Sequence, residues 1–160
     1  MRLYLIRHAE AVDSPPGARF LDDLRALTPR GDRRFRRTAR AFAKLGEPIA
    51  AVRSSPALRA VQTAELLAAQ LERAPVAVLD ELRPNVAAVV LRDWLLSQSA
   101  SSIALVGHGR QLRDLARLLI GPELPFTLKK GCIVRIDLRG QRGNPRWRLR
   151  KREQDLALSA

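Results

Sequence analysis

The chain has 160 residues, of which 46% are hydrophobic and only 4% aromatic, so it is long enough to bury an aliphatic core in one domain. This composition excludes a disordered chain, and the single cysteine, Cys132, excludes an intrachain disulfide and a cysteine-rich metal site. No segment resembles a signal peptide and no apolar run approaches the about 20 residues that cross a bilayer as a helix, so we expect a soluble cytoplasmic protein without membrane association.

Positive charge dominates the sequence, which has 29 lysines and arginines against 16 aspartates and glutamates and a formal net charge of +13. A field of this sign attracts anions, such as phosphorylated ligands, acidic protein surfaces or nucleic acid. The alternative is a composition in which arginine serves only as the general solubilising residue. The excess lies in two stretches, residues 30–44 and 139–152.

The first elements are a strand, a loop and a basic helix. A compact apolar run predicts a buried strand over residues 2–7, and a stretch with two prolines and a glycine predicts a loop over 13–27. Thr28 as N-cap, Pro29 at the first helical position and Gly46 past the end then predict a helix. Its apolar residues recur on one side only, which is typical of an amphipathic surface helix.

The middle of the chain continues this alternation. A short strand is predicted over 49–53, followed by a helix that Ser55 and Pro56 open. A third strand over 76–79 and a helix over 86–96 come next.

The last part adds a fourth strand over 103–107, a helix over 110–121, and two strands, 132–138 and 146–153, that read as an antiparallel hairpin. Strands alternating with helices are typical of a parallel sheet covered on both faces. We therefore predict an α/β fold, a three-layer α/β/α sandwich with a mostly parallel central sheet and an antiparallel C-terminal edge hairpin.

The only two histidines stand at the ends of predicted strands. His8 follows the first strand together with Arg7, and His108 follows the fourth strand in the sequence Gly-His-Gly. Sheets of this kind bind ligands beyond the carboxyl ends of their strands. Both imidazoles are therefore expected at one rim, with the guanidinium groups of Arg7 and Arg59 nearby.

Two histidines and two arginines suit the transfer of a phosphoryl group. Its negative charge spreads over three oxygens, and the planar guanidinium fork donates two parallel hydrogen bonds to such a group. A neutral imidazole nitrogen can attack phosphorus and form a phosphohistidine that water later hydrolyses. The second histidine can stay protonated, which makes it a third cationic donor to the transferring group. This chemistry requires no metal, and no residue suggests another cofactor.

The stretches "LYLIRHAEA", "SSPALRAVQTAE" and "ALVGHG", in this order, closely resemble the histidine phosphatase superfamily, which includes phosphoglycerate mutases. The small size, "LTPRG" and "DELRP" are similar to the SixA-type phosphohistidine phosphatases. The resemblance covers nearly the whole chain and implies a single histidine-phosphatase-like domain over residues 1–160. It implies His8 as the nucleophile, and Arg7, Arg59 and His108 as the phosphate pocket, with Ser55 at the pocket mouth.

The general acid is the open assignment. Larger relatives use a glutamate after the third strand, and Glu81 stands at that place, although a solvated loop carboxylate is an equal interpretation. Glu10 and Asp80 are further candidates. The chain also has Ala9 where many members of the superfamily have glycine, a mild constraint on how closely the backbone approaches the phosphate.

Three functions remain open at this point. An uncovered pocket with a basic rim, including Arg19, Arg83 and Arg110, favours protein phosphohistidine presented by a phosphorelay-type partner. A phosphatase of a small phosphomonoester metabolite is the second hypothesis, and a polyanion-binding module with a vestigial pocket is the third. Nucleic acid is not the expected partner, because Trp147 is the only aromatic residue of the basic tail.

Overall fold

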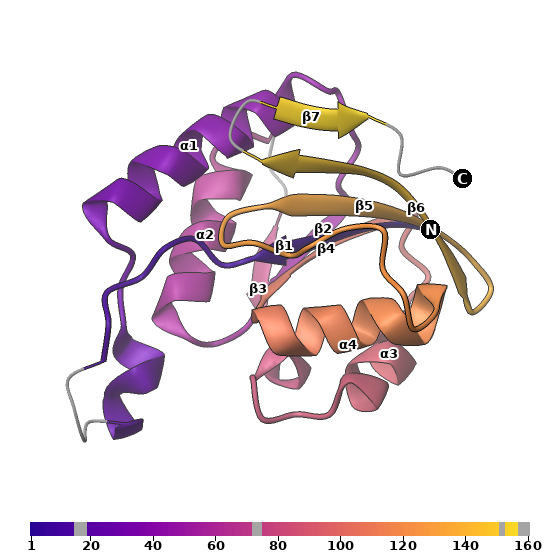
Figure 1. Cartoon of the computed structure of the whole chain (residues 1–160), viewed down its shortest axis with the longest axis horizontal. Coiled ribbons are helices and arrows are strands. Elements are labelled where there is room, and N and C mark those ends of the chain that lie inside the picture. Colours follow the sequence, from indigo (N-terminus) through magenta and orange to yellow (C-terminus); the bar gives the residue numbers. More distant parts are fainter. Residues whose placement is uncertain (15–18, 72–74, 151–152, 157–160) are drawn as a thin grey trace.

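The computed structural model of the protein describes residues 1–14, 19–71, 75–150 and 153–156, with the backbone alone described at 19–21 and 153–156 (Figure 1). Its elements follow one another in the order β1 (Arg2–Arg7), η1 (Arg19–Leu24), α1 (Pro29–Ala43), β2 (Ala51–Ser54), α2 (Leu58–Ala68), β3 (Val76–Val78), η2 (Asp80–Leu82), α3 (Ala88–Leu96), β4 (Ser102–Gly107), α4 (Gly109–Ile120), β5 (Ile133–Arg139), β6 (Arg142–Arg150) and β7 (Glu153–Leu156). The η elements are short 3-10 helices.

The strands of the described residues form one sheet in the order β3-β2-β4-β1-β5-β6-β7. The pairs β2–β3, β2–β4 and β1–β4 are parallel, whereas β5 runs antiparallel to β1 and β6 antiparallel to β5. The predicted α/β class, with its parallel centre and its C-terminal antiparallel hairpin, is confirmed. One further strand, β7, pairs with β6 and extends the sheet beyond the hairpin.

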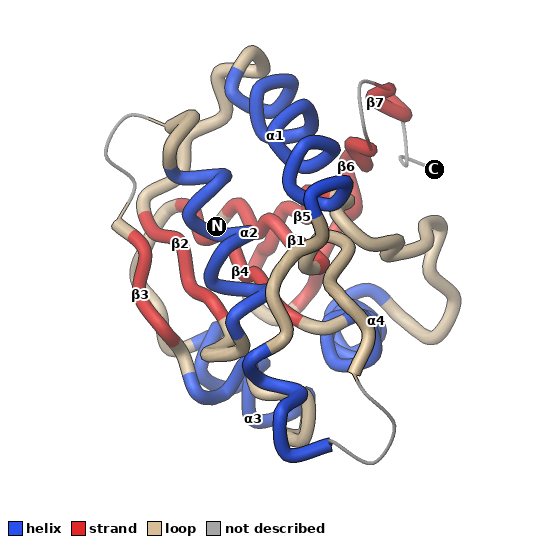
Figure 2. Tube along the Cα trace, turned by 90° about the vertical axis from the view of Figure 1, so that its left-hand side faces the viewer, coloured by secondary structure: helices blue, strands red, loops and turns tan. Residues whose placement is uncertain are grey.

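Helices cover both faces of the sheet. Helices α3 and α4 lie together below the sheet in Figure 1, and α1 lies above the strands with α3 below them in Figure 2. Two hydrophobic clusters fill the spaces between these layers, one under α3 and α4 and one under α1 and α2. In the part of the chain that the structure describes, no helix is long and apolar enough to cross a membrane.

The interiors of β1 and β4 are apolar because both faces of these strands are buried. In β1, Leu3 and Leu5 join the cluster under α3 and α4, whereas Tyr4 and Ile6 join the cluster under α1 and α2. Successive side chains of a strand point to opposite faces, so a strand inside a three-layer sandwich needs an apolar residue at every position. This explains why the run at 2–7 predicts β1 so well.

Helix α1 begins as its capping residues predict. The hydroxyl oxygen of Thr28 accepts a hydrogen bond from the backbone N–H of Gly31 at 2.9 Å, and Pro29 occupies the first turn. Phe35 and Phe42 are buried against the sheet. The rings of Phe42 and Trp147 lie 6.1 Å apart, so Trp147 packs in the core of the sandwich.

Most boundaries differ from the predicted ones by one or two residues, and the strand predicted over 146–153 begins four residues earlier, as β6 at Arg142, because the stretch with Gly143 and Asn144 pairs with β5. Three further differences concern the first half of the chain. The segment 13–27 is not a plain loop, because η1 forms inside it. Strand β2 runs from Ala51 to Ser54 instead of 49–53. Helix α2 begins at Leu58, after Ser55 and Pro56. The hydroxyl of Ser55 contacts Nε2 of His108.

Candidate active site

The two histidines meet at the carboxyl ends of β1 and β4, which point to the left in Figure 1. These strands are parallel neighbours with Arg7 opposite Gly107, so the residues that follow them, His8 and His108, lie side by side. Their ring centroids are 5.4 Å apart and their planes are inclined by 61°. Both side chains are buried. The structure thus brings together the imidazoles that the strand-end positions predict at one rim.

Hydrogen bonds hold His8 in one orientation. Its Nδ1 lies 2.7 Å from the carbonyl oxygen of Ala9, and since a carbonyl only accepts, Nδ1 carries the proton and Nε2 the lone pair. The backbone N–H of His8 donates to the carbonyl of Gly107 at 3.0 Å. The N–H of Gly131 donates to the carbonyls of Arg7 and His8, at 3.0 and 3.2 Å. The end of β1 is therefore anchored on both sides.

The pKa of His8 suits a nucleophile. Burial is the main cause that lowers it to about 3, and the neighbouring His108, Arg59 and Arg7 lower it further, against the opposing effect of the Ala9 carbonyl. The ring is then neutral at physiological pH, with an unprotonated Nε2.

His108 is fixed through both ring nitrogens. Arg59 can only donate, and its terminal nitrogen lies 3.4 Å from Nδ1, so Nδ1 accepts and the Nε2 proton goes to the hydroxyl oxygen of Ser55 at 2.9 Å. Burial first, and then the charge of Arg59, lower the pKa of His108 to about 4. Burial and the charge of Arg59 thus favour the neutral imidazole in the unliganded site, and a protonated His108 beside a bound phosphoryl group stays a prediction. A phosphate group beside the ring would act in the opposite direction, because negative charge raises the pKa of an imidazole.

Arg7 and Arg59 each present a buried donor without an acceptor. Arg7 donates from one terminal nitrogen to the carbonyl of Leu128 at 3.0 Å, while its Nε–H is buried and unpaired. Arg59 is only 3% exposed, and its Nε–H is also buried and unpaired. A buried donor that lacks an acceptor costs about 1–3 kcal/mol. Two such cationic donors beside two imidazoles form a site that suits a tetrahedral oxyanion.

Gly109, the first residue of α4, leaves the space that the side chain of Arg7 occupies. A Cβ at this position would lie 2.8 Å from Nε and 2.9 Å from Cζ of Arg7. Such distances are shorter than any real Cβ contact, so the guanidinium can occupy this position only because residue 109 lacks a side chain.

Sequence reasoning missed Asp22, which lies on η1. Its carboxylate accepts a hydrogen bond from Arg59 at 2.8 Å, and its carbonyl accepts a second one at 2.5 Å. Burial would raise the pKa of the Asp22 carboxyl, but the hydrogen bond and charge of Arg59, with Arg25 at 2.8 Å, outweigh it and lower this pKa. The only signal in the sequence was a pair of aspartates within the longest connection.

The three candidates for a general acid are in different environments. Asp80 is exposed and pairs with Arg83 at 2.9 Å, and Glu10 pairs with arginines of α1, at 2.7 Å for the nearer one. The Glu81 side chain is half-buried and has no hydrogen bond or ion pair with the described residues. Its carbonyl accepts from the side chain of Gln111 at 2.7 Å, which ties η2 to α4 just after His108.

The predicted basic rim is only partly described. Arg83 lies at the surface and pairs with Asp23 at 3.3 Å as well as with Asp80. Arg110 is 88% exposed at the start of α4. The side chain of Arg19 lies outside the described residues.

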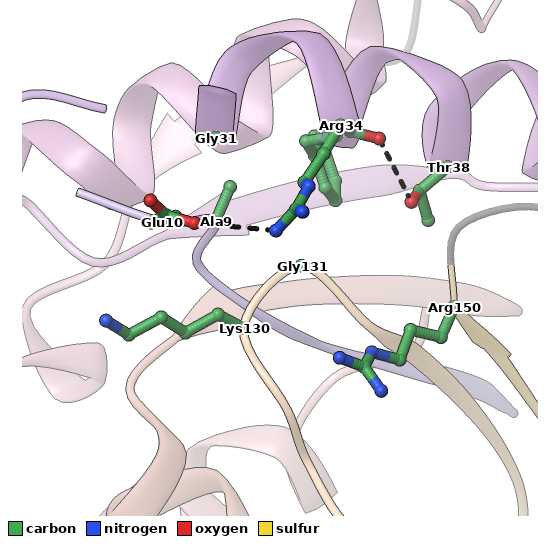
Figure 3. Close-up of a pocket in the computed structure, with 9 residues that line it drawn as sticks. Ala9, Glu10, Gly31, Arg34, Thr38, Lys130, Gly131 and Arg150 are labelled. Atoms are coloured by element: carbon green, nitrogen blue, oxygen red, sulfur yellow. Dashed lines mark hydrogen bonds and ion pairs between the residues drawn. The ribbon is translucent and has the colours of Figure 1, made fainter. Parts of the chain in front are cut away.

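Two hollows flank the histidines. The larger one, of about 710 Å³, runs along α4 and includes Arg7. The smaller one, of about 230 Å³, lies between α1 and the turn at Gly131, and Figure 3 shows Arg34 of α1 above that turn and Arg150 of β6 reaching in from the side. Neither histidine lines either hollow, and the larger one adjoins the histidines through Arg7 and Gly109, the residues next to them in the chain.

The described residues contain no group of three or more His, Cys, Asp or Glu side chains that could hold a metal ion.

Comparisons with known proteins agree with this geometry. Residues 3–84 match the family model of the histidine phosphatase superfamily, branch 1. An uncharacterized protein from Picosynechococcus sp. is 34% identical over 139 residues, which cover 84% of this chain and 83% of that protein. The solved structure of the protein histidine phosphatase SixA with tungstate is 24% identical, has a TM-score of 0.84, and covers 94% of this chain and 97% of its own. A mycobacterial glucosyl-3-phosphoglycerate phosphatase is 18% identical, with a TM-score of 0.69, and covers 90% of this chain and 96% of its own.

Proposed function

The chain belongs to the histidine phosphatase superfamily, and on this premise we propose that it hydrolyses phosphohistidine in a phosphorylated protein through a covalent intermediate on His8. The observation that carries this proposal is the meeting of a neutral His8 with the buried, unpaired Nε–H groups of Arg7 and Arg59. His8 and the two guanidinium groups thus supply the nucleophile and the cationic donors that phosphoryl transfer requires.

In the first step, Nε2 of His8 attacks the phosphorus atom of the substrate. A bond from Nε2 to phosphorus forms as the bond from phosphorus to the substrate imidazole breaks. The electron pair of the broken bond stays on the substrate nitrogen, which takes a proton. The Nε–H groups of Arg7 and Arg59 then find their acceptors in the equatorial oxygens, where negative charge gathers in the transition state.

In the second step, a water molecule attacks the phosphorus atom bound to His8. The bond from Nε2 to phosphorus breaks, its electron pair returns to His8, and inorganic phosphate leaves with the water oxygen. The hydrogen bond from Nδ1 to the Ala9 carbonyl holds the ring in place through both steps. It also stabilises the positive charge of the phosphorylated imidazole.

The choice of phosphohistidine over a phosphate ester rests on the leaving group. Imidazole is readily protonated near neutral pH, so a weakly positioned acid suffices. An alkoxide leaving group needs a well-placed general acid. Glu81 is the candidate for that acid, because it is the only one of the three carboxylates without a partner among the described residues. The fold shared with the protein histidine phosphatase SixA is a second support.

A small phosphomonoester is the second candidate substrate, since a glucosyl-3-phosphoglycerate phosphatase has the same fold. Parallel assays with a phosphorylated phosphocarrier protein and a panel of phosphorylated metabolites separate the two. We expect the higher kcat/KM for the protein, and a higher kcat/KM for any of the metabolites would overturn the proposal.

Glu81→Gln tests the role of the acid. We expect this variant to hydrolyse the P–N bond at nearly the wild-type rate and an alkyl phosphate much more slowly. Asp80→Asn, which alters the neighbouring exposed carboxylate, is the matched control and should change neither rate. Equal losses on both substrates in Glu81→Gln would contradict the preference for a phosphoramidate.

The covalent step can be trapped. Wild-type enzyme mixed with an activated phosphomonoester and quenched in alkali should carry acid-labile phosphate on His8. Normal turnover by His8→Ala would exclude this mechanism.

A further inference from the structure

A basic groove leads away from the phosphate site along α4. We define it by Arg7 at its inner end, Arg110, Arg113 and Arg117 on α4, and residues 122–129 on the opposite wall. Its volume of about 710 Å³ exceeds what one phosphoryl group needs. Because Arg7 lines the groove and also belongs to the phosphate site, the inner end of the groove adjoins the catalytic centre, although neither histidine lines the groove itself.

The three arginines of α4 line one face of the helix. Their spacing of three and four residues places them on consecutive turns of the same side. Leu112, Leu115 and Leu119 of the same helix face the core. The groove arginines are therefore held by a helix that cannot rotate away without exposing the core.

The positive charge of the groove is only weakly neutralised from within. Five of its lining residues are cations and one, Glu123, is an anion. Asp114, on the same helix, lies 3.4 Å from Arg117 and 4.0 Å from Arg110, and Arg113 is exposed with no ion pair among the described residues. This arrangement favours a ligand with several negative charges in a row.

The other wall has an apolar floor. Phe126 and Leu128 are buried, and Leu124 is partly buried, all within the same groove. Since Phe126 is only 6% exposed, it offers no free ring face on which a nucleic-acid base could stack. Acidic side chains with an occasional apolar one match this surface better than a polynucleotide does.

From these features we propose that the groove docks an acidic segment of the phosphorylated protein, next to its phosphohistidine. This inference rests on the proposed function and specifies its partner. The span from Gly109 to Arg117 is about 12 Å at 1.5 Å per residue, which an extended segment of about four residues covers. Such a segment runs along α4 and delivers the phosphoryl group to Arg7 and His8.

The test is a charge reversal in the groove, Arg113→Glu with Arg117→Glu. Its matched control is Arg37→Glu with Arg40→Glu on α1, which changes the net charge equally at exposed positions outside the groove. The kcat/KM of each variant is measured with a phosphohistidine-bearing phosphocarrier protein and with phosphoramidate. The same measurements with wild type are made at low and high salt.

We expect the groove variant to lose at least about tenfold in kcat/KM for the protein, because complementary charge speeds association. It should keep its kcat/KM for phosphoramidate, which has no segment to dock. The control should keep both values, and high salt should remove most of the advantage of wild type over the groove variant.

The outcomes separate the two proposals. Wild type that hydrolyses neither P–N substrate overturns the proposed function and the docking inference with it. Wild type that hydrolyses both, with an undiminished groove variant or an equal loss in the control, overturns docking alone. Fluorescent probes add a further arm: tighter groove-dependent binding of single-stranded DNA than of an Asp/Glu peptide of equal charge would also overturn an acidic protein partner.

Discussion

Replacing Gly109 by alanine should damage catalysis without damaging the fold. The added methyl group would lie 2.8 Å from Nε of Arg7, whereas ordinary van der Waals contact begins at 3.4 Å. Because the obstructing atoms belong to a long side chain, the guanidinium of Arg7 moves and the backbone stays. The required displacement is about 0.6 Å, the difference between these two distances.

A shift of this size matters because Arg7 must meet the oxygens of the transferring group. A misplacement of about 1 Å can cost about a hundredfold in rate, so we expect kcat/KM to fall about 10- to 100-fold. Alanine is the better helix former by about 0.5–1 kcal/mol, so the free energy of unfolding should be unchanged or slightly higher. Lower activity in an equally or more stable protein is the signature of this variant.

The assay is steady-state hydrolysis of phosphoramidate, together with urea unfolding of the same preparations. Leu118→Ala, at an exposed position of the same helix, is the control and should leave kcat/KM unchanged. In a background of Arg7→Ala, the change at Gly109 should have no further effect, because it acts through Arg7. Wild-type kcat/KM in Gly109→Ala, or an undiminished loss in the double variant, would refute the reasoning.

Three further predictions concern the other contacts of the site. Asp22→Ala removes the carboxylate that holds Arg59, so kcat/KM should fall about tenfold on every phosphorylated substrate, the value of one charge-assisted hydrogen bond, and Asp22→Asn should restore part of it. Ser55→Ala removes the acceptor of the His108 Nε2 proton at 2.9 Å and should lower kcat/KM about 3- to 10-fold with KM nearly constant, which initial-rate measurements check. The pKa values of His8 and His108, about 3 and about 4, lie below the about 6.5 of an unfolded histidine, so the unfolded chain binds protons first as the pH falls. The free energy of unfolding should therefore decrease from pH 7 toward pH 4, by up to about 1.4 kcal/mol per pH unit for each histidine, and urea titrations of His8→Gln and His108→Gln should show a shallower decrease.

Much of the architecture follows from local patterns. The apolar run at 2–7 predicts β1, because a strand buried on both faces needs consecutive apolar residues. The capping residues Thr28 and Pro29 predict the start of α1, because a helix cap involves only residues close in sequence. The rim is equally predictable, since parallel strands end on the same side of a sheet, although only the strand order makes β1 and β4 neighbours. The positions of His8 and His108 after two such strands therefore predict that both lie at this rim.

Contacts between distant segments could not be predicted in this way. Arg59 and Asp22 are 37 residues apart, and Arg7 and its acceptor Leu128 are 121 residues apart. No local pattern indicates such a pairing, so the sequence predicts a loop where η1 forms and does not indicate the contact between Asp22 and Arg59. Ser55 illustrates the same limit, because its hydroxyl contacts Nε2 of His108, 53 residues away, as well as the N–H of Ala57 before α2.

The sequence by itself determined the order of helices α1 to α4 and strands β1 to β6, the side of the sheet where the site lies, and the four residues expected there. Only the tertiary structure decided the protonation of His108, the space that Gly109 leaves for Arg7, and the groove along α4. The physical reason is range: propensity and periodicity act over a few neighbours, whereas desolvation, steric fit and charge depend on every atom that the fold brings close.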